Sequence, residues 1–212
     1  MPHGKRIAEY LLSIEAVKFS LTPPFTWTTG LKSPIYCDNR MIYGHPEARA
    51  FVVDALVQRV KALHIEPDAI AGTATAAIGW AALIAEKMHL PFAYVRSKPK
   101  EHGAKKRIEG GLKSNIDVVL IEDLISTGSS SISSVHALRD EGGCRVADIV
   151  SIFSYGLSTS LEAAEEARVR IHSLTSLDTI ITVASAMNIL SDDQVKEIRA
   201  FAKDPTMWSD AH

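Results

Sequence analysis

The sequence predicts an α/β fold with a central, mainly parallel sheet and helices on both faces. Segments typical of buried strands, at 68–72, 92–95, 118–121, 146–153 and 170–173, alternate with helical patterns at 74–89 and 129–140 and with short helices starting near Ser158, Ser176 and Ser191. The segment 118–121 is apolar throughout, as in a strand covered on both faces. With 212 residues and 46% hydrophobic content, the chain can bury one substantial core.

The first part of the chain precedes this alternation. Apolar residues at helical spacing predict a helix over 7–18, and Pro46 opens a second helix at 46–63. Between them, the β-forming residues of 25–38 are interrupted by Thr29 and Gly30, which predicts a hairpin. We expect one domain, residues 1–212. Its first 45 residues or so would form a small hood over the carboxyl edge of the sheet, and the core would run from about residue 46 to residue 212.

Composition and charge exclude several classes of protein. The net charge of −2 argues against general nucleic-acid binding. No apolar run approaches the roughly 20 residues of a membrane span, and residues 1–6 lack the apolar core of a signal peptide. We therefore expect a cytoplasmic protein with no nucleic-acid or membrane partner. Cys37 and Cys144 fit neither a disulfide framework nor a metal pattern, which predicts two free thiols.

The most informative segment follows the strand at 118–121. Glu122 and Asp123 come first, and a small-residue loop around Gly128 then leads into the helix at 129–140. Such a strand-to-helix turn directs backbone N–H groups and the positive end of a helix dipole toward one point, which suits a phosphate. Four hydroxyl side chains can add donors, those of Ser126, Thr127, Ser129 and Ser130.

Carboxylates do not bind phosphate, so the adjacent acids suit the vicinal hydroxyls of a ribose whose 5-phosphate lies in the loop. The alternative, a capped helix after a strand, explains most Ser/Thr/Gly turns but leaves the acidic pair and the four hydroxyls unexplained. The segment has neither the Gly-Lys-Ser/Thr of a Walker loop nor a G-x-G-x-x-G pattern.

A cationic segment spans 96–107, with six Lys or Arg against one acid. It follows a strand, contains Pro and Gly and has no apolar periodicity, which predicts a mobile loop. A charge run is more often a solvated face. Beside a pyrophosphate leaving group, however, a cationic lid would stabilise the departing charge and exclude water.

Residues 118–131 are similar to the phosphoribosyl pyrophosphate (PRPP) signature of the type I phosphoribosyltransferases. Ala71–Gly79 resembles that family's pyrophosphate-binding turn, although small residues before a helix also occur for close packing. The resemblance implies the family's fold and the following PRPP-binding residues: Thr73, Ala74, Arg96, Lys100, His102, Glu122, Asp123, Leu124, Ile125, Ser126, Thr127, Gly128, Ser129 and Ser130.

Two further segments resemble the branch of this family that uses orotate. They are Arg96-x-Lys98-x-Lys100-x-His102-Gly103 and the hairpin segment 25–40. The resemblance implies transfer of the 5-phosphoribosyl group to orotate, which gives orotidine 5'-monophosphate in pyrimidine synthesis. It implies Lys100, His102 and Asp123 as catalytic residues. The implied orotate-binding residues are Thr28, Gly30, Lys32, Tyr36 and Ser126.

In this branch the cationic loop crosses a dimer interface, so the resemblance implies a homodimer that shares loop 96–107. It also implies Mg²⁺ held mainly by the substrate, without dedicated protein ligands and through water at most to Glu122 and Asp123. Many members have a lysine at the position of Thr28 and another near Ala76, and some have an arginine after 153–156; this chain has none of the three. Lys32, Arg40, backbone N–H groups or the partner subunit would then have to bind the orotate carboxylate.

Two other functions share parts of this pattern. A phosphoribosyltransferase for another nucleobase would keep the central motif but would not usually carry the Lys100-x-His102-Gly103 arrangement. A non-catalytic PRPP-sensing regulator would bring an additional DNA-binding module, for which the chain has no room. No general base is apparent, which agrees with an acceptor that is already anionic.

Overall fold

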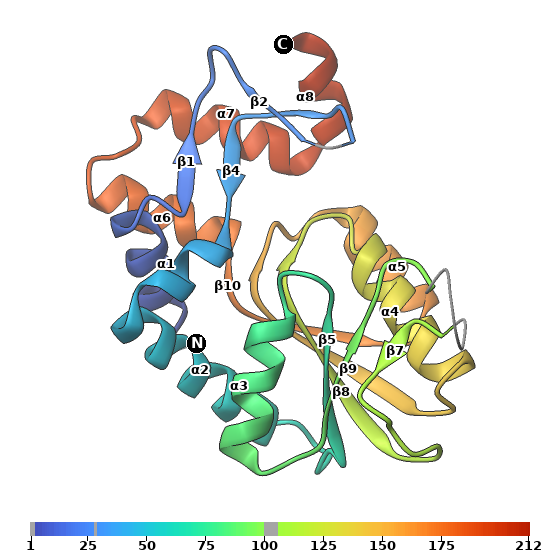
Figure 1. The fold of residues 1–212 in the computed structure, drawn as a ribbon. Helices are drawn as coiled ribbons and strands as arrows, with labels where there is room; N and C mark the ends of the chain where they lie inside the picture. Colours follow the sequence, from blue (N-terminus) through green and yellow to red (C-terminus); the bar gives the residue numbers. More distant parts are fainter. Residues whose placement is uncertain (1–2, 28, 100–105) are drawn as a thin grey trace.

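The computed structural model describes residues 3–27, 29–99 and 106–212 (Figure 1). The amino-terminal elements are α1 (Gly4–Ser13), β1 (Val17–Phe19), β2 (Phe25–Thr26), β3 (Lys32–Ser33), β4 (Ile35–Cys37), the 3-10 helix η1 (Asn39–Gly44) and α2 (Pro46–Lys61). The central elements are β5 (Ala69–Thr73), α3 (Ile78–Met88), β6 (Phe92–Val95), β7 (Ile108–Glu109), β8 (Asp117–Ile125) and α4 (Ser129–Asp140). The last are β9 (Arg145–Ser154), α5 (Ser158–Glu166), β10 (Arg170–Ser176), α6 (Leu177–Ala186), α7 (Asp192–Lys203) and α8 (Pro205–Ala211).

The central sheet has the order β10-β9-β8-β5-β6-β7. Its pairs are parallel except β6 with β7, so the prediction of a mainly parallel α/β sheet is confirmed. From β5 the chain moves outward to β6 and then returns to β8 on the other side of β5. Open α/β sheets bind ligands outside the carboxyl ends of the strands at such a reversal. The fold thereby places the loops after β5 and β8 at its expected binding edge.

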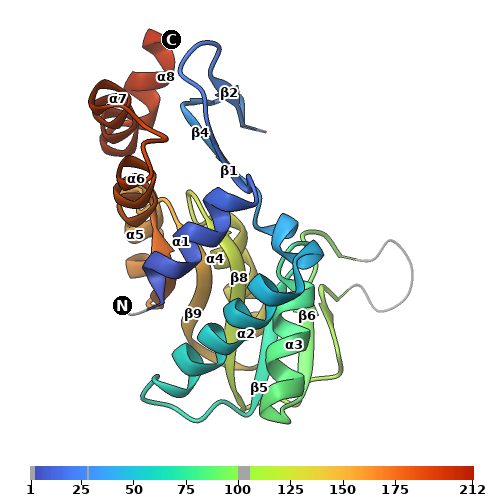
Figure 2. The same ribbon diagram turned by 90° about the vertical axis from the view of Figure 1, so that its left-hand side faces the viewer.

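Helices cover both faces of this sheet, and strand β8 shows why (Figure 2). Val118 and Leu120 lie in a core cluster with residues of α4 and α5. Val119 and Ile121 point the other way, into the larger cluster that includes residues of α2 and α3. All four side chains are fully buried, as the apolar run predicted.

The hood is built from both ends of the described chain. Strand β1 pairs with β4, and β2 pairs with β3, in two short antiparallel ribbons. Helices α7 and α8 lie beside these ribbons at the top of Figure 1. The backbone N–H of Lys32 donates to Ser209 Oγ of α8 at 3.0 Å. The ring of Trp27 packs against Phe201 of α7 with centroids 5.7 Å apart. A helix and a hairpin are present in this region, as predicted, and no local pattern predicted that α7 and α8 would support them.

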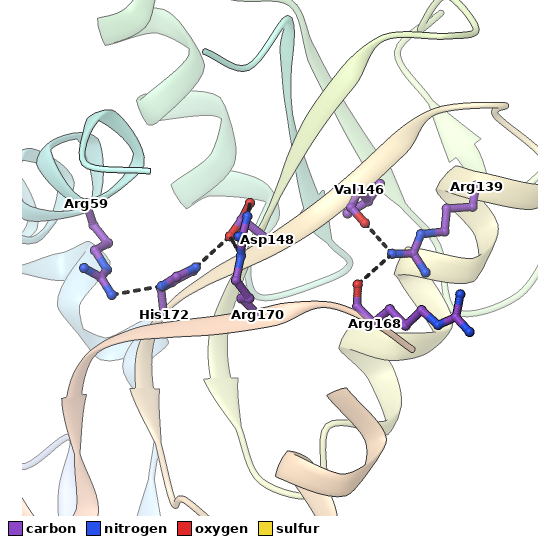
Figure 3. A network of polar contacts seen from close by, with 7 residues as sticks. All are labelled: Arg59, Arg139, Val146, Asp148, Arg168, Arg170 and His172. Carbon is purple, nitrogen blue, oxygen red and sulfur yellow. Dashed lines mark hydrogen bonds and ion pairs between the residues drawn. The ribbon is translucent and has the colours of Figure 1, made fainter. Parts of the chain in front are cut away.

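A polar network fixes the edge strand β10 to its surroundings (Figure 3). The carboxylate of Asp148, on β9, is fully buried and accepts from Arg170 Nε and Nη2 at 2.8 and 2.7 Å. His172 Nε2 lies 2.7 Å from the same carboxylate, and its Nδ1 lies 2.9 Å from Arg59 of α2. Because a guanidinium can only donate, Nδ1 accepts and the imidazole proton is on Nε2. Burial would raise the pKa of Asp148, but its donors outweigh burial and hold that pKa below its usual range.

Several predicted boundaries are wrong. The helix predicted over 7–18 ends at Ser13, because Glu15 adopts a left-handed φ of +55° and Val17 starts strand β1. Residues 74–77 form a turn rather than the first turn of α3. Strand β8 continues past Ile121 to Ile125, so the acidic pair lies on the strand.

The hairpin prediction over 25–38 is only partly correct, since β4 pairs with β1 rather than within the hairpin. Within the described part of the chain, no helix is long and apolar enough to cross a membrane.

Candidate active site

The turn after β5 is held by close packing at Gly72. A Cβ on this glycine would lie 2.7 Å from the carbonyl oxygen of Ala77 and 2.8 Å from Cβ of Ala81. Only glycine therefore allows the turn and helix α3 to approach the strand so closely. At the end of β5, Thr73 is buried and its Oγ1 has no hydrogen-bond partner among the described residues. An unpaired hydroxyl at this edge is suited to a polar ligand.

The loop after β8 leads directly into helix α4. Gly128 precedes the helix with a φ of +82°, a left-handed conformation that favours glycine, and Ser129 is the first helical residue. Ser129 and Ser130 are exposed, and Ser129 Oγ lies 3.0 Å from Thr127 Oγ1. The loop thus places hydroxyls at the positive end of the helix, as predicted for a phosphate site.

Glu122 faces the protein interior. Its side chain is 3% exposed. One carboxylate oxygen accepts from the backbone N–H of Asp123 at 3.1 Å, and the other accepts from Ser131 Oγ at 2.9 Å. Burial, followed by the neighbouring Asp123, raises the pKa of Glu122. Glu122 therefore ties the end of β8 to the first turn of α4.

Asp123 is the more accessible member of the acidic pair and is half-buried. Burial raises the pKa of its carboxyl group. The carbonyl oxygen of Asp123 accepts from Asn39 Nδ2 at 2.6 Å. Because Gly72 lies opposite Ile121 in the sheet register, the ends of β5 and β8 run side by side. The structure therefore brings the predicted residues of the two turns, Thr73–Ala74 and 122–130, to one edge.

The cationic segment is described only in part, since Lys100 and His102 fall outside the described residues. Arg96 Nη1 lies 3.6 Å from Glu109, with 41% of the arginine side chain exposed. Arg107 donates through its guanidinium to the carbonyl oxygen of Arg96 at 2.8 Å and to Ser133 Oγ at 3.0 Å. Arg107 therefore anchors the carboxyl end of the segment to α4.

The hairpin meets the loop after β8 (126–130, the predicted phosphate loop) around a cavity of about 400 Å³. Gly30 and Leu31 line it on one side, Thr127 on another, and the starts of α5 and α8 complete it. Gly30 has a left-handed φ of +88°. Of the predicted orotate residues, Gly30 thus shares a cavity with the phosphate loop, whereas Thr28 lies outside the described residues.

Three other residues named for orotate do not line this cavity as described. Tyr36 is 40% exposed, and its ring centroid lies 5.7 Å from that of Phe25. Lys32 contacts α8 through its backbone N–H, and Ser126 is half-buried in the loop after β8. Arg40 pairs bidentately with Asp38 at 2.6 and 2.8 Å, so its guanidinium already has a carboxylate partner.

The carboxylates at the edge of the sheet decide whether the site suits a metal ion. No group of three or more His, Cys, Asp and Glu side chains suitable for an ion occurs in the ranges 3–27, 29–99 and 106–212. Mg²⁺ commonly binds through substrate phosphates and one or two carboxylates. Asp123, half-buried at the edge of the sheet, is a suitable carboxylate of this kind.

Sequence reasoning missed two residues that contact the binding loops. Asn39 reaches the end of β8, and Tyr43 donates from its hydroxyl to the carbonyl oxygen of Ala76 at 2.9 Å. The available signal was the run Asp38-Asn39-Arg40 directly after a strand, where polar side chains commonly cap a following turn.

A family model, curated relatives and solved structures that are similar to this chain all point to one family. The family model described as phosphoribosyl transferase domain matches residues 38–197. The orotate phosphoribosyltransferase of Listeria monocytogenes serotype 4b is 44% identical over 96% of this chain and 97% of that protein. The enzyme of the same name from Staphylococcus saprophyticus is 45% identical over 92% of this chain and 96% of that protein. The crystal structure of orotate phosphoribosyltransferase from Aeropyrum pernix superposes with a TM-score of 0.72 at 26% identity, covering 87% of this chain and 99% of that one.

Proposed function

Because the chain belongs to the phosphoribosyltransferase family, we propose that it is an orotate phosphoribosyltransferase that acts in the cytoplasm. The enzyme transfers the 5-phosphoribosyl group from PRPP to orotate. A bond forms between an orotate ring nitrogen and C1 of the ribose as the bond from C1 to pyrophosphate breaks, and the electron pair leaves with pyrophosphate. The products are orotidine 5'-monophosphate and pyrophosphate.

One observation carries the proposal for the donor. The turn after β5 and the loop after β8 lie together at the reversal of strand order, with an acidic pair between a small-residue turn and a helix amino terminus. The 5-phosphate would lie over Ser126–Ser130, where the first turn of α4 offers backbone donors. Asp123 would accept from the ribose hydroxyls, and Thr73 would donate its unpaired hydroxyl toward the diphosphate.

The cavity of about 400 Å³ between the hairpin and the phosphate loop supports the acceptor assignment. Gly30 of the hairpin and Thr127 of the phosphate loop both line it, so a planar ring held there would lie beside the phosphate loop. Its lining among the described residues offers hydroxyls and backbone groups rather than cations. These hydroxyl and backbone N–H groups would then bind the orotate carboxylate. Thr28, Lys32 and Tyr36, which were also predicted to bind orotate, are near Gly30 in the sequence.

The leaving group requires cations. Lys100 and His102 would act on pyrophosphate from the cationic segment, with Arg96 as a further contact. Charge develops on pyrophosphate as the bond to C1 breaks, and preorganised cations stabilise such charge in a site that excludes water. Mg²⁺, bound through the phosphates and Asp123, would neutralise part of this charge.

The acceptor is tested by mixing the protein with PRPP and Mg²⁺ and offering orotate, uracil, adenine and hypoxanthine separately. We expect pyrophosphate release with orotate alone. Release with a purine would replace the orotate assignment with a purine one. PRPP binding without release from any acceptor would identify a PRPP-sensing protein.

The functional unit would be a homodimer in which the segment 96–107 completes the partner's site. Such a reciprocal dimer has two equivalent composite sites. Lys100→Ala and Asp123→Asn proteins, each nearly inactive, would be mixed and allowed to exchange subunits. In a mixed dimer one site receives both defects and the other neither, so one of its two sites should work. Random exchange of an equal mixture makes about half of the dimers mixed, so about a quarter of all sites should recover. Confirmed exchange without recovery would show that the segment serves its own subunit.

A further inference from the structure

The 3-10 helix η1 is firmly anchored between the hood and α2. The side chain of Asp38 accepts from the backbone N–H of Arg40 at 3.1 Å and so caps its start. Ile42 is fully buried in the larger core cluster. Arg49 of α2 donates to the carbonyl oxygen of Tyr43 at 2.8 Å. The position of this short helix is therefore fixed, and its side chains can hold neighbouring loops in place.

From the start of η1, Asn39 reaches the end of strand β8. It is fully buried, and its Nδ2 donates to the carbonyl oxygen of Asp123 at 2.6 Å. A carbonyl oxygen only accepts, so this contact sets the orientation of the amide group. The amide oxygen then accepts from Cys37 Sγ at 3.4 Å. Both ends of the amide are thus hydrogen-bonded, and the Nδ2 contact ties the end of β8 to η1.

From the other end of η1, Tyr43 reaches the turn after β5. Its hydroxyl donates to the carbonyl oxygen of Ala76 at 2.9 Å. Its ring stacks on Trp80 of α3, with centroids 4.4 Å apart and planes 18° from parallel. Gly79 leaves the hydroxyl its space, since a Cβ there would lie 2.7 Å from it. Tyr43 is therefore held in one position against the turn.

We infer that η1 sets the spacing of the two halves of the PRPP site, with Asn39 and Tyr43 as positioning residues. This inference rests on the proposed function for the meaning of the two loops. Asn39 fixes the backbone that carries Asp123, on the ribose side. Tyr43 fixes the turn containing Ala76, on the pyrophosphate side. Neither residue needs to touch the substrate, because each acts through a backbone carbonyl group of the loop that does.

The test measures the two halves of the donor separately, by titration calorimetry with ribose 5-phosphate and with pyrophosphate. Both titrations are done without Mg²⁺, because an ion shared between the phosphates and Asp123 would couple the two probes. Asn39→Leu keeps the branched shape and removes the donor, and Asn39→Asp is measured as well in case the leucine protein does not fold. Tyr43→Phe removes only the hydroxyl. We expect Asn39→Leu to weaken ribose 5-phosphate on the order of tenfold, the effect of one hydrogen bond, and to spare pyrophosphate. Tyr43→Phe should weaken pyrophosphate binding and leave ribose 5-phosphate binding unchanged.

Tyr10→Phe is the matched control, because the Tyr10 hydroxyl donates to Glu47 between α1 and α2, away from both loops. It should bind both probes as the unchanged protein does. Equal weakening of both probes by either site variant would indicate a merely structural role and overturn the inference, and so would unchanged binding. These probes contain no acceptor, so failure of the orotate assignment would appear only as absent turnover with orotate.

Discussion

Gly72→Ala tests whether close packing holds the turn after β5. The added methyl group would lie 2.7 Å from the carbonyl oxygen of Ala77 and 2.8 Å from Cβ of Ala81. Neither atom is the far end of a flexible side chain, so relief requires movement of the turn or of α3 away from β5. The substitution should therefore disturb the site as well as the fold.

The size of the effect follows from this geometry. Overpacking a well-packed core costs about 1–3 kcal/mol. We expect the upper part of that range, about 2–3 kcal/mol, because two rigid contacts are violated at once. For a domain of this size such a loss lowers the midpoint of thermal unfolding by on the order of 4–12 °C. The KM for PRPP should rise, while the KM for orotate should change little.

The assay combines thermal unfolding with steady-state kinetics. Gly44→Ala serves as the stability control, because the added Cβ would meet nothing within 4 Å. The midpoint of thermal unfolding of this variant should be unchanged or slightly higher. An unchanged midpoint for Gly72→Ala would refute the packing argument. A lowered midpoint with an unchanged KM for PRPP would show that the turn after β5 does not contact the donor.

Three further substitutions test other features. Because burial raises the pKa of Glu122, the unfolded chain loses this proton at lower pH than the folded state, and the group costs stability as pH rises above about 4.3. Glu122→Gln cannot ionise, so thermal midpoints measured from about pH 5 to pH 8 should fall less steeply than those of the unchanged protein. Asp148 has a lowered pKa, so it stabilises the folded state above about pH 3.9, and this stabilisation is lost as pH falls below that value. Asp148→Asn should lower the free energy of unfolding by at least about 1.5–3 kcal/mol at neutral pH, measured by urea unfolding. It should also make that free energy fall less as the pH is lowered. Ser191→Ala removes the capping box of α7 and should cost about 0.5–2 kcal/mol by the same measurement; no loss would mean that this helix end contributes nothing to stability.

Local patterns predicted the fold class well because they report burial directly. The apolar run at 118–121 indicated a strand covered on both faces, and the sheet confirms it. The same logic failed at Val17, which fits a helical stripe but pairs with Cys37 in a β-ribbon. A three-residue strand depends on its distant partner, and that partner is not visible in the local pattern.

The sequence predicted which segments of the candidate site lie together, because each is a continuous turn after a parallel strand. The residues 122–130 meet Thr73 and Ala74 at one edge, because parallel strands present their carboxyl ends together. The contacts of Asn39 with β8 and of Tyr43 with the turn after β5 could not be predicted, since each joins elements far apart in the sequence. The difference in burial between Glu122 and Asp123 also depends on how α4 packs over the strand.

The contact between Lys32 and Ser209 joins residues 177 positions apart. During synthesis the hairpin emerges early and cannot gain this neighbour until α8 has been made. The central sheet has all of its strands well before that point. The packing of the amino-terminal ribbon on α8 therefore closes a loop of 177 residues, and contacts of such long range are typical of slower folding. A growing chain would therefore contain the turns after β5 and β8 well before it contains the helix that supports its hairpin.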